Sequence, residues 1–350
     1  MLIYRSAYGP RGAADVVNPQ VKMISSHISH MALHSVWRDS GVTQKHGFEL
    51  LVDVCFVPRA DGEVLGFRDR APRLLQGEYD FISGLHHETY IYRARGDRRF
   101  VYLAQAQNDW DDRFIARPEV RTPKDLEGHK VMVADRATCV FGNLKHALQI
   151  AGVDLDAVEF VSLESQDPTT SHTVVDAVAR GEAIAGNVAI PFDVVGQKRG
   201  LHTVAIPSLP VIHNATICAN REWVQRNKET AVAFLKSMID AIHFFKREKS
   251  RVCEILEREL APIVRITAPD EIEHLHTVWA ELLFPKPYPH PLAVWNVYVL
   301  EVAPDPNLNF IGPFEIWDTS LLRTIDDSGY VDELYDGAHL ARNPDVNSVI

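Results

Sequence analysis

The alternation of strand-like and helix-like segments over the first 283 residues constrains the fold of this chain more than any other feature. Short runs rich in Val, Ile and Phe recur between segments whose apolar residues have helical spacing. The expected strands are residues 21–25, 49–57, 80–83, 100–107, 131–134, 158–163, 183–189, 204–206 and 215–219. The expected helices are residues 30–40, 71–76, 86–95, 140–151, 173–180, 191–200, 222–246 and 270–283. Strands that alternate with helices predict α/β layers around largely parallel sheets.

Two further features set the expected organisation. At 350 residues the chain is longer than one ordinary core, so two lobes are expected. Prolines 285, 287, 289 and 291 then interrupt regular structure. We therefore expect residues 284–350 to form a Pro-rich C-terminal extension that wraps the body as loops with short helices.

Charge and cysteine content exclude several classes of function. The net charge is -11 and the acidic and basic residues are interspersed, so the clustered basic face of a nucleic-acid-binding protein is not expected. The four cysteines are scattered without the spacing of a zinc ribbon or redox pair, which implies no structural disulfide. Only a small-molecule partner is expected, and a homo-oligomer is left open.

The hydropathy of the chain indicates the cellular compartment in which the protein is expected. The N-terminal residues carry Arg5 and Arg11 but lack the apolar core of a secretory signal, and no later segment approaches a membrane span. A cytoplasmic protein is expected. The alternative is a periplasmic protein from which a signal peptide has been removed.

Six phrases of the sequence resemble one known family. In order they are HGFEL, LLQGEYDF, TPKDLEGHKVMVA, LKHALQIAGVDLDAVEFVSL, AVARGEAIAG and REWVQRNKETAVAFLKSMIDAI. They resemble the type 2 periplasmic-binding-protein fold, in the branch that contains sulfonate-binding proteins and the pyrimidine synthase of thiamin biosynthesis. The resemblance implies two α/β lobes, joined by two crossing strands, with ligand in the cleft between them. The first lobe would comprise residues 20–107 and 216–283, and the second residues 108–215.

A local phrase resembles a narrower branch of this fold. PVIHNATICANREW, residues 210–223, is similar to the proline-apolar-apolar-histidine segment before the crossing strand of hydroxyphthalate decarboxylases. The cysteine-rich run that pyrimidine synthases carry near this point is absent. Decarboxylation is therefore favoured over pyrimidine synthesis.

Loops at the carboxyl ends of parallel strands hold the candidate site residues, because ligands of α/β folds bind there. Substrate binding is assigned to His30, Arg136, Thr138, Cys139, Asn187 and Asn214. Catalytic roles are assigned to His213, His87 and Glu88. A divalent metal, Zn, Fe or Mn, would be held by His30, His86 and His213, and the alternative is no cofactor.

Each candidate also has a purely structural interpretation. His34 shares a helix face with His30 at a spacing that lets two imidazoles hold one metal, but it can equally pack behind the loop. Cys139 suits a small core position, and Glu88 suits a helix start. Arg136 is either a carboxylate clamp or a surface residue.

Two functions from different classes follow from these residues. Histidines can hold the charge left on an aromatic ring when CO2 departs, and they can protonate the ring carbon. The preferred prediction is a cytoplasmic lyase of aromatic compound catabolism, a decarboxylase of a hydroxylated aromatic or related small carboxylate. The alternative is a solute-binding protein of an ABC-type uptake system for a small organic anion. A regulatory sensor ranks third because no output domain is evident.

Overall fold

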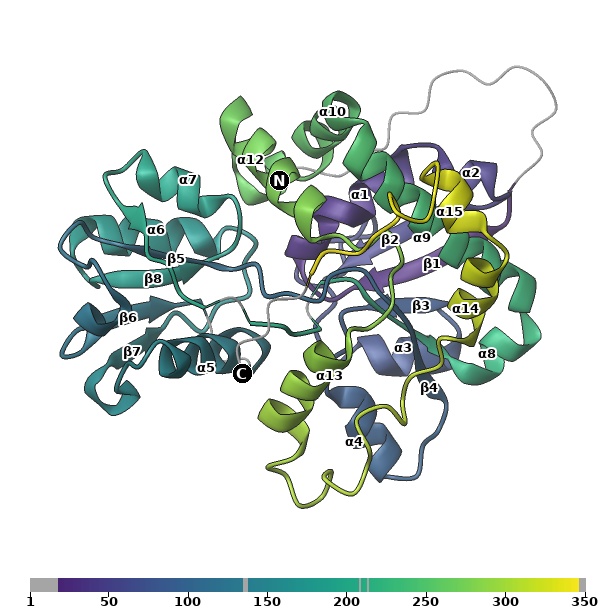
Figure 1. Cartoon of the computed structure of the whole chain (residues 1–350), viewed down its shortest axis with the longest axis horizontal. Coiled ribbons are helices and arrows are strands. Elements are labelled where there is room, and N and C mark those ends of the chain that lie inside the picture. Colours follow the sequence, from purple (N-terminus) through teal and green to yellow (C-terminus); the bar gives the residue numbers. More distant parts are fainter. Residues whose placement is uncertain (1–17, 135–137, 208, 213, 346–350) are drawn as a thin grey trace.

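Two α/β lobes lie side by side, with the connecting segments crossing between them, as Figure 1 shows. The computed structural model describes residues 18–134, 138–207, 209–212 and 214–345, without the side chains of Thr138 and Cys139. The expected two-lobed α/β fold is confirmed. The exact lobe boundaries, at 107/108 and 215/216, stay a prediction.

The first lobe is built on a five-stranded sheet with the order β2-β1-β3-β10-β4. Its strands are β1 (Gln20–Ser25), β2 (Glu49–Val54), β3 (Phe81–Ser83), β4 (Phe100–Gln105) and β10 (Thr216–Asn220). β1 runs parallel to β2 and β3, whereas β10 runs antiparallel to β3 and β4. The chain therefore returns from the second lobe into the middle of the first sheet.

Helices pack against this sheet around a core that contains aromatic side chains. They are α1 (Met31–Asp39), α2 (Val42–Lys45), α3 (Arg70–Gln76), α4 (Glu88–Ala94), α8 (Arg221–Arg226), α9 (Lys228–Arg247), α10 (Lys249–Glu259), α11 (Ala261–Val264) and α12 (Pro269–Leu282). Phe234 of α9 stacks on Phe81 of β3 with ring centroids 3.7 Å apart, and Trp37 of α1 packs against the ring of Phe234. The single helix expected over residues 222–246 is divided at Asn227 into α8 and α9.

The second lobe contains a five-stranded sheet with the order β7-β6-β8-β5-β9. Its strands are β5 (Arg113–Ala116), β6 (Lys130–Val133), β7 (Glu159–Ser162), β8 (Ala185–Val188) and β9 (His202–Thr203). Its helices are η2 (Pro123–Leu126), the π-helical turn η3 (Thr138–Gly142), α5 (Asn143–Ile150), η4 (Leu155–Ala157), α6 (Thr170–Arg180) and α7 (Phe192–Gln197). Two expectations were wrong here. β5 was not predicted, and the last strand is 202–203 rather than 204–206.

The C-terminal extension contacts both lobes. It contains α13 (Pro291–Val297), the π-helical turn η5 (Tyr298–Val302), α14 (Ser320–Asp327) and α15 (Tyr330–Leu334), and it runs along the first lobe in green to yellow in Figure 1. Val294 of α13 is buried in the core of the second lobe, whereas Val302 of η5 is buried in a core cluster of the first. Pro291 occupies the first turn of α13, where proline is tolerated. Within the described residues, no helix combines the length and apolar character that crossing a membrane requires.

Asp240 of α9 ties the extension to the first lobe, which gives a pH-dependent prediction. Its carboxylate lies 2.6 Å from Lys45 Nζ and 3.0 Å from His46 Nε2, and it accepts a hydrogen bond from Tyr330. Burial raises the pKa of Asp240, but the hydrogen bonds from His46, Lys45 and Tyr330 outweigh it and leave this pKa below its usual value. The charged carboxylate therefore stabilises the fold above the ordinary aspartate pKa, about 3.9, and this contribution is lost as the pH falls through the lower native pKa.

Asp240→Asn should lower the free energy of unfolding by about 1–3 kcal/mol at neutral pH. The difference from the wild type should shrink as the pH falls below about 4. Urea unfolding at several pH values measures both quantities. A difference that stayed constant with pH would contradict the assigned role of the carboxylate.

Candidate functional site

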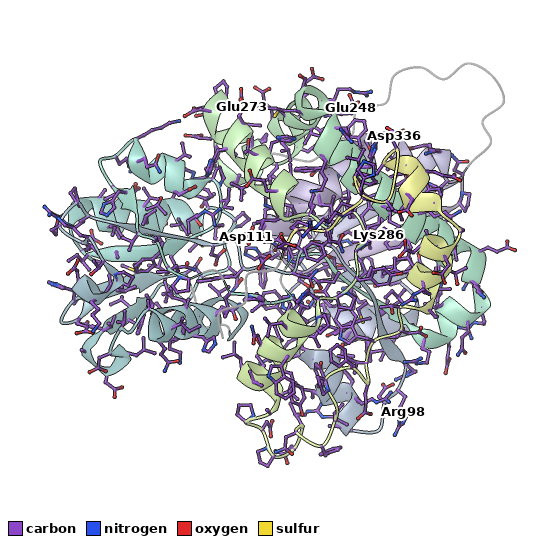
Figure 2. All side chains as sticks on the ribbon, viewed as in Figure 1. Arg98, Asp111, Glu248, Glu273, Lys286 and Asp336 are labelled. Carbon is purple, nitrogen blue, oxygen red and sulfur yellow. The ribbon has the colours of Figure 1, made fainter. Side chains whose placement is uncertain are left out.

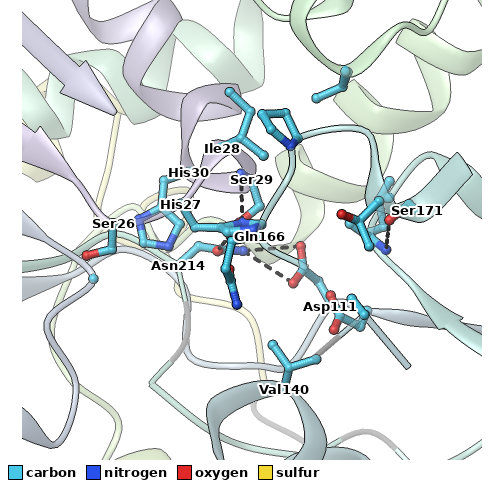
Figure 3. A pocket seen from close by; sticks show the side chains of 18 of the residues that line it. Ser26, His27, Ile28, Ser29, His30, Asp111, Val140, Gln166, Ser171 and Asn214 are labelled. Atoms are coloured by element: carbon cyan, nitrogen blue, oxygen red, sulfur yellow. Dashed lines mark hydrogen bonds between the residues drawn. The ribbon is translucent and has the colours of Figure 1, made fainter. Parts of the chain in front are cut away.

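A cavity of about 350 Å³ lies where the two lobes and the crossing segments meet. Figure 3 shows His27, Ile28, Ser29 and His30 from the first lobe facing Gln166 and Ser171 from the second. Of the expected site residues, the cavity is lined by His30, His86, His87, Glu88, Asn187 and Asn214. The expectation that loops at the strand ends converge on one cleft therefore agrees with the described structure for these six positions.

His30 is seated by a close approach of the backbone. The residue is only 4% exposed, and its Nδ1 lies 3.2 Å from Ser83 Oγ. Gly84 follows Ser83 at a φ of +89°, and a Cβ at this position would lie 2.3 Å from His30 Cε1. A glycine is therefore required at residue 84, both for the backbone conformation and for the space that His30 fills.

His34 does not join His30 in the cavity. Its ring is buried behind His30, with centroids 5.8 Å apart, and it is not among the residues that line the cavity. Burial lowers the pKa of His34 to about 3, so the ring is neutral. The structural alternative, in which His34 packs behind the loop, describes this residue correctly.

His86 and His87 line the cavity from the loop before α4 and Glu88 from the first position of α4, but each residue is held by a different partner. The backbone carbonyl of His86 accepts a hydrogen bond from Tyr102. His87 Nδ1 lies 2.7 Å from Glu301 Oε2 of the extension. Glu88 pairs with Arg70, and although burial raises the pKa of Glu88, the positive charge of Arg70 leads the influences that lower it below its usual value. Two paired groups therefore line the cavity here. They are the His87 imidazole, which contacts the Glu301 carboxylate, and the Glu88 carboxylate, which contacts the Arg70 guanidinium.

Arg70, which the sequence analysis did not single out, is the buried cation of the cavity. The residue is 3% exposed, donates to the carbonyls of Phe67 and Gly84, and also bonds Ser26 Oγ. Arg70 is the first residue of α3, in the segment RAPRLLQ. This segment resembles an ordinary helix start, so the sequence did not indicate that Arg70 is buried at the cavity.

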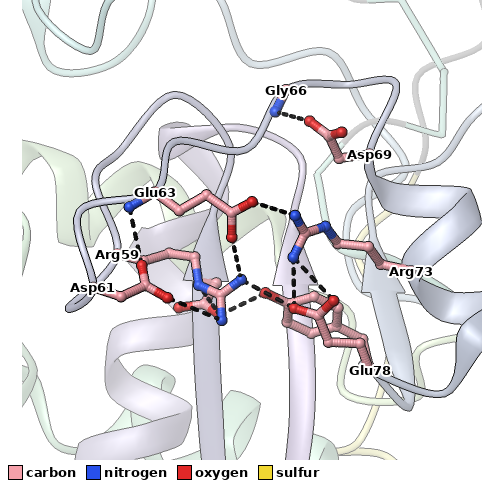
Figure 4. Close-up of polar contacts among 9 residues, drawn as sticks. Arg59, Asp61, Glu63, Gly66, Asp69, Arg73 and Glu78 are labelled. Carbon is pink, nitrogen blue, oxygen red and sulfur yellow. Dashed lines mark hydrogen bonds and ion pairs between the residues drawn. The ribbon is translucent and has the colours of Figure 1, made fainter.

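A polar network fixes the position of α3 and hence of Arg70. Figure 4 shows Arg73 of α3 bound to Glu63 and Glu78, while Arg59 bonds the same two carboxylates. The loop from 56 to 69 is thereby fastened to the helix that carries Arg70. Because these side chains are partly exposed, their ion pairs add little to the free energy of unfolding and act mainly by fixing the position of α3.

Asn214 connects the lobes at the floor of the cavity. Its Oδ1 accepts from Ser29 Oγ at 3.1 Å, and its Nδ2 lies 3.2 Å from Asp111 Oδ1, as the dashed lines and labels of Figure 3 help to follow. Figure 2 places Asp111 between the two lobes. Asn187 Nδ2 donates to Asp112 Oδ2 at 2.9 Å. Asp111 and Asp112 were not predicted as site residues, although they belong to the polar run NDWDD that follows an expected strand.

An apolar wall closes the cavity on the side of α11 and α12. It is formed by Ile28, Phe192, Leu260, Val264, Leu275 and Trp279. Apolar walls with a few placed polar groups are typical of small-molecule sites. Such a lining suits a small molecule with both apolar and polar parts.

The remaining expected residues are not all described. His213 and Arg136 lie outside the described residues, and Thr138 and Cys139 are described only as part of the backbone of η3. Val140 of the same turn lines the cavity. Among the described side chains, no three His, Cys, Asp or Glu residues lie close enough to share a metal ion. The expected Zn, Fe or Mn ion at His30, His86 and His213 stays a prediction.

Polar contacts between α7 and α12 join the lobes beside the cavity. Lys198, which follows α7 directly, lies 2.9 Å from both Asp270 Oδ1 and Glu271 Oε1, and Asp193 of α7 lies 2.9 Å from His274 Nε2. Glu271 and Asp193 are buried, but the Lys198 side chain is 41% exposed, so its contacts add only about 1 kcal/mol to the free energy of unfolding. Their position across the cleft gives them a different role, which is to hold the lobes close together.

Lys198→Glu should open the cleft with little loss of stability. The substitution places a carboxylate against Asp270 and Glu271, so the radius of gyration in small-angle X-ray scattering should rise. The free energy of unfolding should fall by only about 1 kcal/mol. Lys249→Glu is the matched control, because Lys249 lies 2.8 Å from Glu273 within the first lobe. If both variants scatter alike, the contacts of Lys198 do not control the cleft.

Comparison with solved structures shows the same fold across most of the chain. A putative periplasmic sulfonate-binding protein from Methylobacillus flagellatus KT is 12% identical, with a TM-score of 0.63 over 95% of this chain and 99% of that chain. The periplasmic nitrate-binding protein NrtA from Synechocystis PCC 6803 is 12% identical, with a TM-score of 0.61 over 89% of each chain. The aliphatic sulphonate-binding protein SsuA from Escherichia coli is 14% identical, with a TM-score of 0.56 over 76% of this chain and 84% of that chain. Comparison with curated proteins gives no match.

These findings correct the expected function. The three neighbours named above are described as sulfonate- or nitrate-binding proteins, so the prediction of a lyase of aromatic catabolism was wrong. The geometry gives a physical reason, because the described histidines have separate partners: His30 contacts Ser83, His87 contacts Glu301 and His34 is buried. The similarity of residues 210–223 to decarboxylases finds no support.

The family itself is established by sequence. Residues 72–248, just over half of the chain, match the model of the family described as NMT1/THI5 like. The resemblance to the branch that contains sulfonate-binding proteins and the thiamin pyrimidine synthase is thereby confirmed at the level of the family. The chain belongs to the NMT1/THI5-like family.

Proposed function

We propose that this protein is a solute-binding protein that holds a small organic anion in the cleft between its lobes. The observation that carries the proposal is the composition of the cavity: one side has imidazoles and amides, with the carboxylates Glu88, Asp111 and Asp112 bound by Arg70, Asn214 and Asn187, and the other side is an apolar wall. The receptors for sulfonate and nitrate that share the fold support an anionic ligand.

The start of α6 also favours an anion. Pro168, Thr170 and Ser171 line the cavity at the N-terminus of this eleven-residue helix, where the helix dipole attracts negative charge. Ser171 faces the cavity in Figure 3. An anionic head near the imidazoles and α6, with an apolar body against Leu275 and Trp279, satisfies both sides of the cavity.

A receptor role has consequences for partner and location. The neighbouring sulfonate- and nitrate-binding proteins are described as periplasmic. We therefore propose the periplasm as the compartment of this protein and a membrane permease of the ABC type as its partner.

A ligand screen tests the proposal directly. Trp279 lines the cavity, so binding should change tryptophan fluorescence. Alkyl and aryl sulfonates and carboxylates should bind saturably at one site, and alcohols with the same carbon skeletons should bind at least about tenfold more weakly, since they lack the charge-assisted hydrogen bond. If no anion binds, or if the alcohols bind equally well, the anion-receptor role is wrong.

A further inference from the structure

The C-terminal extension reaches the ligand cavity through one carboxylate. Glu301 of η5 lies 2.7 Å from Nδ1 of His87, and its side chain is 5% exposed. The other side of the same imidazole is open, since the His87 side chain is 37% exposed and lines the cavity. The pair thus connects the interior of the extension to the cavity.

From this arrangement we infer that Glu301 is a ligand-positioning residue: it orients His87 so that Nε2–H meets the anionic head of the ligand. The inference rests on the proposed function and deepens it, because it assigns the ligand's negative group to one named atom.

The hydrogen-bonding capacity of the two groups supports this orientation. The 2.7 Å contact is an ion pair with a buried carboxylate, and an ion pair requires the imidazolium form of His87, in which both ring nitrogens carry a proton. Nε2–H is then the donor that remains for the ligand, because within the described part of the chain Glu301 is the only polar partner of the His87 ring. A carboxylate that fixes one imidazole nitrogen while the other nitrogen binds a ligand is a recurrent arrangement of histidine sites.

The charges around His87 favour its protonated form. Burial alone lowers the pKa of His87, but the hydrogen bond and negative charge of Glu301, with the charge of Glu88, outweigh burial and the positive charge of Arg70, so this pKa is raised. Arg70 is itself paired with Glu88, and His86 is the remaining titratable neighbour on the loop. A charged imidazole donates a stronger hydrogen bond to an anion than a neutral one.

The placement of Glu301 is fixed by packing on both sides. Val302 beside it is fully buried, and Tyr298 of the same turn donates to the carbonyl of Asn309 at 3.1 Å. Tyr90 of α4 donates to the carbonyl of Pro313 at 2.7 Å, which joins the extension to the helix that follows His87. Burying a carboxylate is costly unless it is paired, so the position of Glu301 depends on its contact with His87.

Glu301→Gln tests the inference, because it keeps the shape of the side chain and removes its charge. Nitrogen NMR of histidine-labelled protein reads His87 directly, with His87→Gln to assign its signals. The account expects the wild-type ring to titrate at a higher pH than the ring in Glu301→Gln. Hexanesulfonate is the binding probe, and the variant should bind it about tenfold more weakly, with a smaller change of the Nε2 signal on binding.

Glu333→Gln, an exposed carboxylate on α15 of the same extension, is the matched control and should change neither reading. Identical His87 titration in the wild type and Glu301→Gln would overturn the inference, whether or not hexanesulfonate binds. Equal affinity of the two proteins for hexanesulfonate would also overturn it. Failure of every anion of the screen to bind the wild type is a separate result, which would remove the proposed function instead.

Discussion

Replacing Arg70 by methionine is expected to lower the free energy of unfolding by about 3 kcal/mol and to abolish ligand binding. Removing one partner of a buried ion pair costs about 3–5 kcal/mol, and the partial exposure of Glu88 places the expected loss near the lower end. The carbonyls of Phe67 and Gly84 lose their donor at the same time. Urea unfolding and the fluorescence titration measure the two effects.

Two further variants separate the causes of this loss. Arg70→Met combined with Glu88→Gln removes the unpaired charge, so the loss should fall to about 1–2 kcal/mol, the cost of unsatisfied carbonyls. Arg73→Met on the same helix removes only partly exposed ion pairs and should cost at most about 1 kcal/mol. If Arg70→Met and Arg73→Met are equally stable, Arg70 is not the buried cation on which the cavity depends.

Gly84→Ala is expected to displace His30 and to weaken ligand binding strongly. An alanine at a φ of +89° costs about 1–2 kcal/mol, and the overlap with the His30 ring adds about 1–3 kcal/mol. Because the nearest obstacle is the ring itself, the ring should move out of the position that lines the cavity. Binding of hexanesulfonate and the free energy of unfolding should fall together.

The double variant Gly84→Ala with His30→Ala isolates the overlap. Without the ring, adding the Cβ should cost the conformational part, about 1–2 kcal/mol relative to His30→Ala alone, and a small shift of Ser26, whose Cβ lies 3.0 Å from the added atom. Gly77→Ala is the matched control, because Gly77 has a φ of +77° with no atom within 4 Å of the added Cβ. If Gly84→Ala lowers the free energy of unfolding as much in the His30→Ala background as in the wild type, the His30 ring is not what the glycine accommodates.

Local periodicity predicted most of the helices and strands, and the resemblance to a known family supplied the fold. The strands at 20–25, 49–54 and 100–105 and the helices at 31–39 and 269–282 have clear apolar patterns, and the ordered phrases of the family fixed how they assemble. The missed elements have weak local signals. β5 follows directly on the polar run NDWDD, and it pairs with β8 and β9 only through contacts distant in sequence.

The site was less predictable because its geometry depends on contacts across the chain. His30, His86, His87 and Asn214 were found because histidines and amides at strand ends are visible in sequence. Arg70 and Glu301 were missed, since nothing near them in the sequence indicates that each meets a partner 18 and 214 positions away, respectively. The same difficulty led to the wrong function: sequence shows that histidines gather, but it does not show that each has its own partner.

The most direct test of the account is calorimetric titration of the purified protein with the tightest-binding anion of the screen, followed by recovery of that ligand. We predict one ligand bound per chain and its recovery unchanged. Release of CO2 or a chemically altered ligand would contradict the account, and so would binding that His30→Ala leaves intact.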